Sequence, residues 1–560
     1  AFGVVPIAAG QSEESLATVR GLLQSGECVC LFPEGAISRN GQLGKFHTGY
    51  ERAVAGVEEG VIVPFYLCGL WGSSLSRAEE GLRRARVPLR RRDLIVAFGD
   101  PLPLSTGAKQ LKQHVFELSL TAWDAYTRKL DPVPLAWLRA ARRYPAGTAC
   151  IEGRSRMSNH QLVTDVACLA GTLGRQPDGE RIGILLPAGS ATIVTSLAIL
   201  LRGRVLVPLN YTAGSAQVRE TVEAAGLGRV ITSRRFADEL AGQGVELETM
   251  TGAVPLVYLE ELEKRTPAWR RLLTGLQARL LPPAWLYRLH GTPRAIDEPA
   301  AIMFTRGGER GSRGVLLSHR NIVANCRQIS DVLNTDVDDV MLCCLPPFHS
   351  LGLTVTTMMP LVEGIPVTCH ADPRDAVGVA RAIARSRATL LVTTPSFLQL
   401  YAGDERVHPL LLESLRLVVS GADHLSDEVR RLFELRFGKR IYEGYGTTET
   451  TPVASVNVPD AMDMKDWKVQ QGNLPGTVGM PLPGTSFRIV DPVTLEEKPL
   501  GEDGLVLISG NQVMLGYLGD EEATGRVMSE RGGLRWFHSG DRGKLTEEGF
   551  LVLQGKAGPA

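Results

Sequence analysis

The chain has 560 residues, of which 44% are hydrophobic and 22% charged, the composition of an ordinary soluble globular protein. Lysine plus arginine and aspartate plus glutamate number 61 each, so there is no global basic field for binding nucleic acid. No uninterrupted apolar stretch approaches the ~20 residues that span a bilayer. At about 150 residues per domain, the length predicts three or four domains. The cysteines form no CxxC pair, and we expect buried, reduced thiols, Cys28 and Cys30 included.

Residues 1–105 predict a small α/β unit. A short helix pattern and three apolar strand segments follow one another, the helix at 15–24 and the strands at 27–32, 60–67 and 94–98. Short apolar runs joined by helices are typical of a sheet with helices packed on it.

The pattern changes after this unit. A helical stretch at 108–129 ends before Pro132-Val133-Pro134, so residues 106–134 are expected to form a helical linker. From residue 135 the chain alternates longer strands and helices, with strands expected at 182–186, 204–209, 390–394 and 415–420 and a helix at 191–201. This alternation predicts a doubly wound sheet, and such sheets bind ligands beyond the carboxyl ends of their strands.

The first motif, Phe32-Pro33-Glu34-Gly35, makes a tight turn after a predicted strand and displays Glu34 and Arg39 at its mouth. Alone it is a modest signal. With Phe46-His47-Thr48-Gly49-Tyr50-Glu51 and Ile62-Val63-Pro64-Phe65, it resembles the glycerolipid acyltransferase family over residues 1–105.

That resemblance implies binding of the glycerol-phosphate part of an acyl acceptor by Phe32, Glu34, Gly35 and Arg39. An exposed loop without function is the alternative for Arg39. The catalytic base of the family is a histidine paired with an aspartate in an HxxxxD motif. That motif is expected upstream of residue 1, so we assign no catalytic base.

Two further segments point to a membrane surface. Residues 76–92 contain seven arginines against two glutamates, and residues 268–288 carry large apolar side chains at helical spacing with arginines between them. A charge run is usually a solvated face, and an apolar stripe more often faces a core. Contact with anionic lipid headgroups and an interfacial helix are the alternatives.

The most specific motif is Glu443-Gly444-Tyr445-Gly446-Thr447-Thr448-Glu449, which follows the apolar run 415–420. Its glycines allow close approach of a ligand to the backbone, Thr448 offers a hydroxyl donor, and Glu449 is a hard oxygen ligand suited to magnesium. Asp541, in His538-Ser539-Gly540-Asp541, can accept two hydrogen bonds from a ribose diol. The pieces in this order predict a site for a nucleotide and its metal.

A third piece is the loop from Thr305 to Gly314, which can hold phosphates through its hydroxyl, its glycine N–H groups and Arg313. With Leu345-Pro346-Pro347-Phe348-His349-Ser350-Leu351-Gly352, these motifs resemble the adenylate-forming superfamily over residues 135–556. The resemblance implies ATP and Mg²⁺ as cofactors and an acyl-adenylate as product. The closest likeness is to the bacterial bifunctional acyl-ACP synthetase/2-acylglycerophosphoethanolamine acyltransferase family.

The roles implied by this resemblance are those of ATP, metal and acyl binding. Gly421, Ala422 and Tyr445 would border the adenine, Thr448 would touch the α-phosphate, and Glu449 would hold the metal. Asp541 would bind the ribose, and His349 would stand by the acyl pocket. The ATP-binding set comprises Thr305, Gly307, Arg313, Gly314, Gly421, Ala422, Tyr445, Thr448, Glu449 and Asp541.

The phosphate loop departs from the family pattern, which commonly has small hydroxyl residues and a final lysine. Here Arg306, Arg310 and Arg313 stand in the loop, and arginine does not replace lysine geometrically. Gln554-Gly555-Lys556 marks the hinge to a C-terminal swinging domain, which with its catalytic lysine is expected to lie outside this chain.

The sequence therefore predicts an α/β chain, a partial glycerolipid acyltransferase domain followed by the large N-terminal domain of an adenylate-forming enzyme. Its expected work is activation of a fatty acid, transfer to acyl carrier protein (or CoA) and acylation of a lysophospholipid. We expect a peripheral position on the cytoplasmic side of the bacterial inner membrane, and no nucleic-acid partner. A long-chain fatty acyl-CoA synthetase and a catalytically silent lipid- or nucleotide-binding protein are the alternatives.

Overall fold

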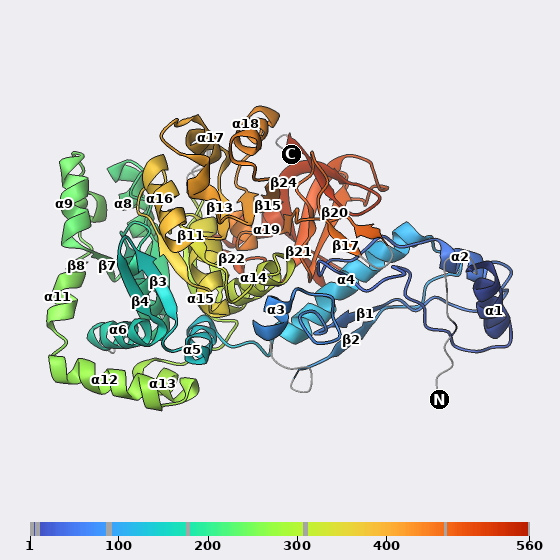
Figure 1. Ribbon diagram of the computed structural model, residues 1–560, viewed down its shortest axis with the longest axis horizontal. Helices are drawn as coiled ribbons and strands as arrows, with labels where there is room; N and C mark the ends of the chain where they lie inside the picture. Colours follow the sequence, from blue (N-terminus) through green and yellow to red (C-terminus); the bar gives the residue numbers. More distant parts are fainter. Residues whose placement is uncertain are drawn as a thin grey trace.

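Two large, mainly parallel sheets form the centre of the computed structural model, which describes residues 5, 12–85, 92–174, 180–305, 312–463 and 467–557 (Figure 1). The strands of the first sheet are β5 (Arg181–Ile184), β6 (Val205–Pro208), β7 (Arg229–Thr232), β8 (Leu256–Tyr258), β9 (Pro299–Phe304), β10 (Gly314–Ser318) and β22 (Gly516–Tyr517). Their order is β22-β10-β9-β6-β5-β7-β8. Pairs from β9 to β8 are parallel, and β10 and β22 add antiparallel strands at one edge.

The second sheet has nine strands in the order β19-β16-β15-β14-β13-β11-β12-β3-β4. They are β3 (Thr148–Glu152), β4 (Ser155–Ser158), β11 (Met341–Cys343), β12 (Val367–Cys369), β13 (Leu390–Thr393), β14 (Leu417–Ser420), β15 (Ile441–Tyr445), β16 (Ser455–Val456) and β19 (Met480–Pro481). The run from β15 to β3 is parallel, so the carboxyl ends of these strands meet along one edge.

Helices cover both faces of both sheets because alternate residues of each strand point to opposite sides. In β14, Leu417 and Val419 join the central core while Val418 joins an outer one. The central core also takes α5 (Val133–Arg143), α6 (Asn159–Thr172), α7 (Ser190–Leu201), α14 (His319–Val332), the π-helix η2 (Leu351–Met358) and α15 (Met359–Glu363). The outer layers are α16 (Ala376–Ser386), α17 (Pro395–Gly403) and α18 (Asp427–Phe437), and α8 (Ser215–Ala225), α9 (Arg234–Gly242) and α10 (Leu247–Thr251).

A five-stranded sheet follows in the chain and closes one end of a large cavity. It comprises β20 (Thr485–Val490), β21 (Gly504–Gly510), β23 (Met528–Arg531), β24 (Leu534–Leu545) and β25 (Leu551–Lys556). Between residues 409 and 527 the chain also forms η3 (Pro409–Leu412), η4 (Thr448–Thr450), the hairpin of β17 (Ala461–Asp463) and β18 (Lys468–Gln470), and α19 (Glu521–Val527). Three further helices are α11 (Leu259–Lys264) at the left of Figure 1 and, along its lower side, α12 (Ala268–Leu280), which packs on α6, and α13 (Pro283–His290), which packs on α5.

The N-terminal unit is built around one long helix. Its elements are α1 (Ser12–Gln24), α2 (Gly49–Val54), β1 (Phe65–Cys68), α3 (Glu80–Ala85), β2 (Ile95–Phe98) and α4 (Ala108–Thr127). One face of the β1–β2 ribbon packs on α4 around the buried Trp123. From α4, Glu117 pairs with Arg488 of β20 at 2.8 Å, so this helix attaches the unit to the five-stranded sheet.

Most predicted elements are confirmed within a few residues, and one strand is wrong. The helices expected at 15–24 and 108–129 are α1 and α4, and the strand expected at 94–98 is β2. Residues 27–32 form no strand, because they share no backbone ladder with a described strand, although the Phe32 side chain packs against Phe65 of β1. Cys28 and Cys30 are exposed rather than buried. The strand expected at 60–67 begins only at Phe65.

No helix of the described residues is long and apolar enough to cross a membrane.

Candidate active site

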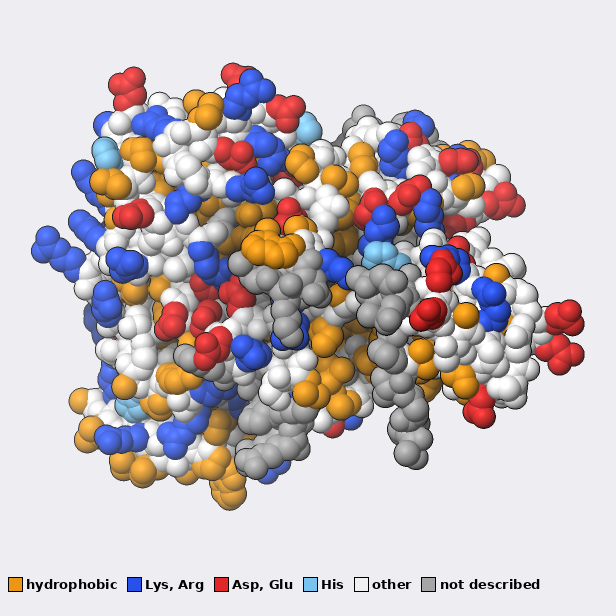
Figure 2. All heavy atoms as spheres, turned by 45° about the vertical axis from the view of Figure 1, so that its right-hand side comes forward, with side chains coloured by type: hydrophobic (Ala, Val, Ile, Leu, Met, Phe, Trp, Pro, Cys, Tyr) orange, Lys and Arg blue, Asp and Glu red, His pale blue; other side chains and the backbone are white. Residues whose placement is uncertain are grey.

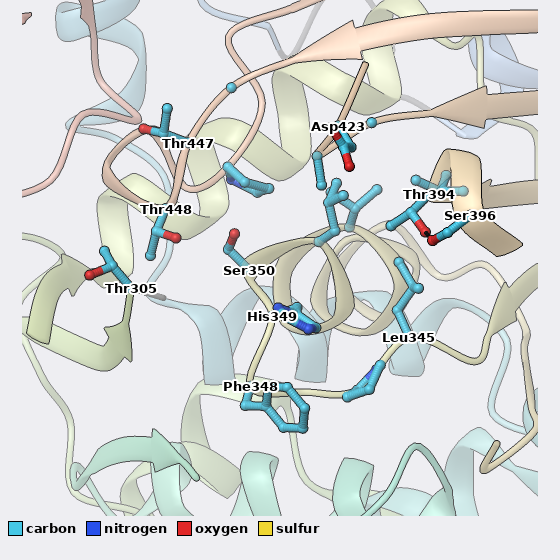
Figure 3. Close-up of a pocket in the computed structure, with 18 of the residues that line it drawn as sticks. Thr305, Leu345, Phe348, His349, Ser350, Thr394, Ser396, Asp423, Thr447 and Thr448 are labelled. Atoms are coloured by element: carbon cyan, nitrogen blue, oxygen red, sulfur yellow. Dashed lines mark hydrogen bonds between the residues drawn. The ribbon is translucent and has the colours of Figure 1, made fainter. Parts of the chain in front are cut away.

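One large cavity, of about 2060 Å³, opens where the carboxyl ends of the central strands meet the five-stranded sheet. Its wall draws on segments more than 300 residues apart, from Pro187 to Lys556. Figure 3 shows Thr305, Thr447 and Thr448 on one side of this space, His349 and Ser350 in the middle, and Thr394 and Ser396 on the other side. A doubly wound sheet places its ligand-binding crevice at this edge.

Most of the predicted site residues lie in this one wall, namely Thr305, His349, Gly421, Ala422, Tyr445, Thr448, Glu449 and Asp541. Arg313 and Gly314 belong to the same loop and strand as Thr305 but do not line the cavity. Gly307 lies outside the described residues, as do Arg306 and Arg310. The assigned roles of these residues in ATP binding stay predictions.

The turns that present these residues follow directly from strand ends. After β14, Gly421 leads into Ala422, whose φ of 70° is unusual for a residue with a side chain. After β15, Gly446 admits no side chain, since a Cβ there would stand 1.7 Å from the Pro452 carbonyl oxygen. The chain can therefore fold back tightly into η4 and set Thr448 and Glu449 at the mouth of the sheet.

The carboxylate of Asp541 is held from two sides. Tyr445 donates its hydroxyl to Asp541 Oδ2 at 2.7 Å, and Lys556 Nζ lies 2.7 Å from Oδ1. Burial, and next the Asp541 charge, raise the pKa of Tyr445, so this phenol stays a donor. Each carboxylate oxygen has a second lone pair, so the arrangement keeps acceptors for a diol while fixing their direction.

Glu449 is nearly buried, and its Oε1 accepts a hydrogen bond from the Tyr517 hydroxyl at 2.9 Å. The guanidinium carbon of Arg313 lies 5.2 Å from the centre of the Tyr517 ring. Arg313 thus reaches the site through Tyr517 rather than through the cavity wall. Burial, and next the Glu449 charge, raise the pKa of Tyr517.

The donor set around Glu449 fits a magnesium ion that arrives with a nucleotide. Among the described residues no group of three His, Cys, Asp or Glu side chains forms a ready-made metal cage. Magnesium typically takes one or two carboxylates and completes its shell with phosphates and water. Glu449 supplies one such carboxylate, with one oxygen held by Tyr517, and the hydroxyl of Thr448 is its neighbour in the chain. This set of donors is compatible with magnesium coordination of that kind.

Beyond these polar groups the wall becomes apolar. The His349 ring lies tilted beside Phe348 at 4.6 Å between ring centres, and Phe348 meets Tyr211 edge-on at 5.0 Å. Behind them the cavity is lined by residues of the central core, Ile329, Leu333, Val355, Val392 and Val419. The π-helix η2, which carries Val355, widens this part of the central layer.

The N-terminal motif lies away from this cavity, and none of its residues lines the wall. Glu34 accepts a hydrogen bond from the Gly44 N–H at 2.6 Å, and burial raises the pKa of its carboxyl. The Arg39 N–H donates to Gln470 Oε1 at 2.7 Å, while Phe32 is largely exposed beside Phe65. Gly35 has a φ of 64°. The loop is thus braced at Glu34 and Arg39, and acceptor binding stays a prediction.

Sequence reasoning missed several partners of the site. Tyr517, which holds Glu449, and Lys556, which pairs with Asp541, come from distant segments, and Arg430 pairs with Glu443 in the same wall. For Tyr517, the available sequence signal was its position after Gly516 in a short apolar run.

The comparisons with known proteins fit this geometry. The family model of the AMP-binding enzymes matches residues 137–518. The chain belongs to this family. The acyltransferase family model matches residues 1–67, so the chain joins an acyltransferase segment to an AMP-binding domain.

Individual relatives share about a quarter of their residues with the chain. A feruloyl-CoA synthase from Amycolatopsis sp is 29% identical over 422 residues, covering 74% of this chain and 76% of the relative. A long-chain-fatty-acid–CoA ligase from Bacillus subtilis is 26% identical over 445 residues, 74% of each chain. The crystal structure of apo MatB from Rhodopseudomonas palustris superposes with a TM-score of 0.60 at 25% identity, covering 76% of this chain and 79% of that one. The fold is therefore that of the adenylate-forming enzymes.

Proposed function

We propose that this AMP-binding enzyme activates a long-chain fatty acid with ATP, forming an acyl-adenylate that is passed to acyl carrier protein. The observation that carries the proposal is the apolar part of the cavity. Ile329, Leu333 and Val355 extend the wall behind His349 into the central core. A methylene chain gains free energy from such burial, whereas a short polar acid does not.

The polar part of the wall suits the other reactant. Thr305 and Thr448 offer hydroxyl groups to phosphate oxygens, Asp541 offers acceptors to the ribose, and Glu449 would hold Mg²⁺. When bound, the ion offsets negative charge on the phosphates. The protein's own task is to hold the acid near His349 in line with the α-phosphate and to keep water out.

The N-terminal unit would then transfer the acyl group to a lysophospholipid. The acyltransferase family match and the braced loop at Phe32, Glu34, Gly35 and Arg39 support this half of the proposal. The pairing is chemically coherent, because one half makes the thioester that the other consumes. We place the protein, as part of this proposal, at the cytoplasmic side of the bacterial inner membrane, where ATP and lysophospholipid are both available.

CoA is the second candidate for the thiol acceptor. Two relatives named above are a feruloyl-CoA synthase and a long-chain-fatty-acid–CoA ligase, which supports CoA as the acceptor. The two thiols are separated by one assay, which measures thioester formation by the intact protein with acyl carrier protein or CoA at equal concentration.

The central proposal is tested by fatty-acid-dependent ATP–pyrophosphate exchange by the intact protein across a series of chain lengths. We expect exchange to increase from short to long acids, and Val355→Phe to reduce exchange with the longest acids while sparing short ones. Exchange that prefers a short polar or aromatic acid would contradict the fatty-acid assignment. No exchange with any acid would favour the silent-protein alternative.

A further inference from the structure

Helix α12 turns its large apolar side chains away from the protein. Helix α12 packs on α6, and its buried residues, Thr274 and Ala278, are small. The opposite side carries Trp269, Leu272, Leu273, Leu276 and Leu280, all exposed, at the spacing of one helical stripe. Leu272 is 78% exposed. The expectation of a core-facing stripe is therefore wrong, and α12 is amphipathic toward solvent.

Helix α13 continues this apolar surface. Trp285 and Leu289 are exposed, while Leu286 and Tyr287 pack inward. The two exposed tryptophans thus stand on successive helices, with the leucines between them in sequence. We call the seven side chains the α12–α13 face, and it consists of Trp269, Leu272, Leu273, Leu276, Leu280, Trp285 and Leu289.

The charge around this face has one sign. From 264 to 296 the sequence contains seven lysines and arginines and no aspartate or glutamate. Arg279 and Arg288 are exposed next to the leucines, and Arg142 at the end of α5 donates to the Arg279 carbonyl oxygen at 2.5 Å. Acids outside this stretch pair with two of its arginines, Asp165 with Arg271 at 2.5 Å and Glu298 with Arg294 at 3.0 Å.

The face lies on one side of the whole molecule. Figure 1 shows α12 and α13 along the lower side, and in Figure 2 orange side chains gather along the lower left edge with blue ones beside them. The β1–β2 ribbon lies below α4 in Figure 1, and its uncovered face carries Leu67, Val96 and Phe98, all exposed.

We propose that the α12–α13 face is a docking surface for an anionic lipid bilayer, lying in the headgroup region with its leucines among the acyl chains. Exposed leucines flanked by arginines are the composition of interfacial helices, and tryptophan is enriched at this depth. Anionic headgroups complement the stretch 264–296, which is rich in arginine and contains no aspartate or glutamate. A second copy of the chain would instead bring the same positive surfaces together. The proposal does not depend on the reaction proposed above.

The test uses the native chain and two sets of vesicles, phosphatidylglycerol mixed with phosphatidylethanolamine, and phosphatidylcholine alone. We expect co-sedimentation with the anionic vesicles and much weaker binding to the neutral ones. The double variant Leu272→Glu/Leu276→Glu should lower binding to anionic vesicles at least about tenfold. The matched control is Leu435→Glu on α18, at the upper side of Figure 1, where Leu435 is 80% exposed.

Two further measurements separate the outcomes. Circular dichroism and thermal unfolding check that the double variant is folded. Sedimentation velocity without lipid reports self-association. Loss of vesicle binding in the double variant alone supports the proposal. It is overturned if the native chain ignores anionic vesicles, if Leu435→Glu loses binding equally, or if the double variant only breaks a dimer.

Discussion

The large cavity and the N-terminal loop are held in place by different means. These cavity residues follow the ends of buried parallel strands, so the nine-stranded sheet itself fixes Ala422, Tyr445 and Glu449. The Phe32–Gly35 loop follows no strand. It is held by two backbone hydrogen bonds, from Gly35 to Phe32 and from His47 to Pro33, and by the side-chain contacts of Glu34 with Gly44 and of Gln470 with Arg39. The first site should therefore tolerate changes in its surroundings, whereas the second should depend on its few braces.

The largest expected effect is at Glu449. Glu449→Gln keeps the size of the side chain but removes the charge that would hold magnesium, so we expect ATP–pyrophosphate exchange to fall by at least about a hundredfold. Glu239→Gln is the control, because Glu239 lines the same cavity but is exposed. Exchange close to normal at saturating magnesium would remove Glu449 from the metal site.

The sequence was sufficient for those parts of the fold that local pattern decides. The apolar runs at 390–394 and 415–420 gave β13 and β14, since a buried parallel strand needs a short continuous apolar run. The turn residues after them indicated one common wall for Gly421, Thr448 and Glu449.

Long-range information was missing elsewhere. Residues 27–32 have the amino-acid composition of a strand, but a strand also needs a partner strand for its backbone hydrogen bonds. The pattern of apolar residues does not show whether such a partner is present. In α12 the helical spacing of the apolar residues was predicted correctly, but the side to which they point was not. They face solvent, because the buried side of the helix carries the small residues Thr274 and Ala278. The Tyr517–Glu449 contact joins residues 68 positions apart, beyond any local signal.

Glu34 offers the next largest effect. Glu34→Ala removes the acceptor for the Gly44 N–H, and we expect lysophospholipid acylation from preformed acyl-ACP by the intact protein to fall roughly tenfold or more. ATP–pyrophosphate exchange should be unchanged, since Glu34 lies outside the cavity wall.

Glu34→Gln separates bracing from recognition. Its amide oxygen can still accept from Gly44, so activity should recover if Glu34 only braces the loop, and should stay low if its charge contacts the acceptor. Equal loss of both activities in Glu34→Ala would point to unfolding rather than to either role.

Lys112 tests the junction between the two regions. It is buried in α4 and donates to the Glu548 carbonyl oxygen at 2.6 Å, and burial lowers its pKa from 10.5 to about 8. Between pH 8 and 10.5 the unfolded chain therefore binds more protons at Lys112 than the folded chain does. The free energy of unfolding increases with pH across that window. Relative to Lys112→Met, the native chain should gain about 1–2 kcal/mol in free energy of unfolding between pH 7.5 and 9.5. Parallel denaturant titrations at the two pH values check this, and a constant difference would mean that Lys112 does not titrate there.

The smallest effect is expected at Arg313, where the sequence and the structure suggest different roles. A direct phosphate contact would be worth about 1.5–3 kcal/mol, or roughly 10- to 100-fold in ATP affinity. The structure instead places Arg313 over the Tyr517 ring and outside the wall, and such a cation–π contact is worth about 0.5–2 kcal/mol.

We therefore expect Arg313→Ala to raise the apparent KM for ATP only several-fold, and Arg313→Lys to recover part of it. Tyr517→Phe keeps the ring but removes the bond to Glu449, so it should alter magnesium dependence more than Arg313→Ala does. A rise above tenfold in Arg313→Ala would restore the direct phosphate role, and no change would separate Arg313 from the site.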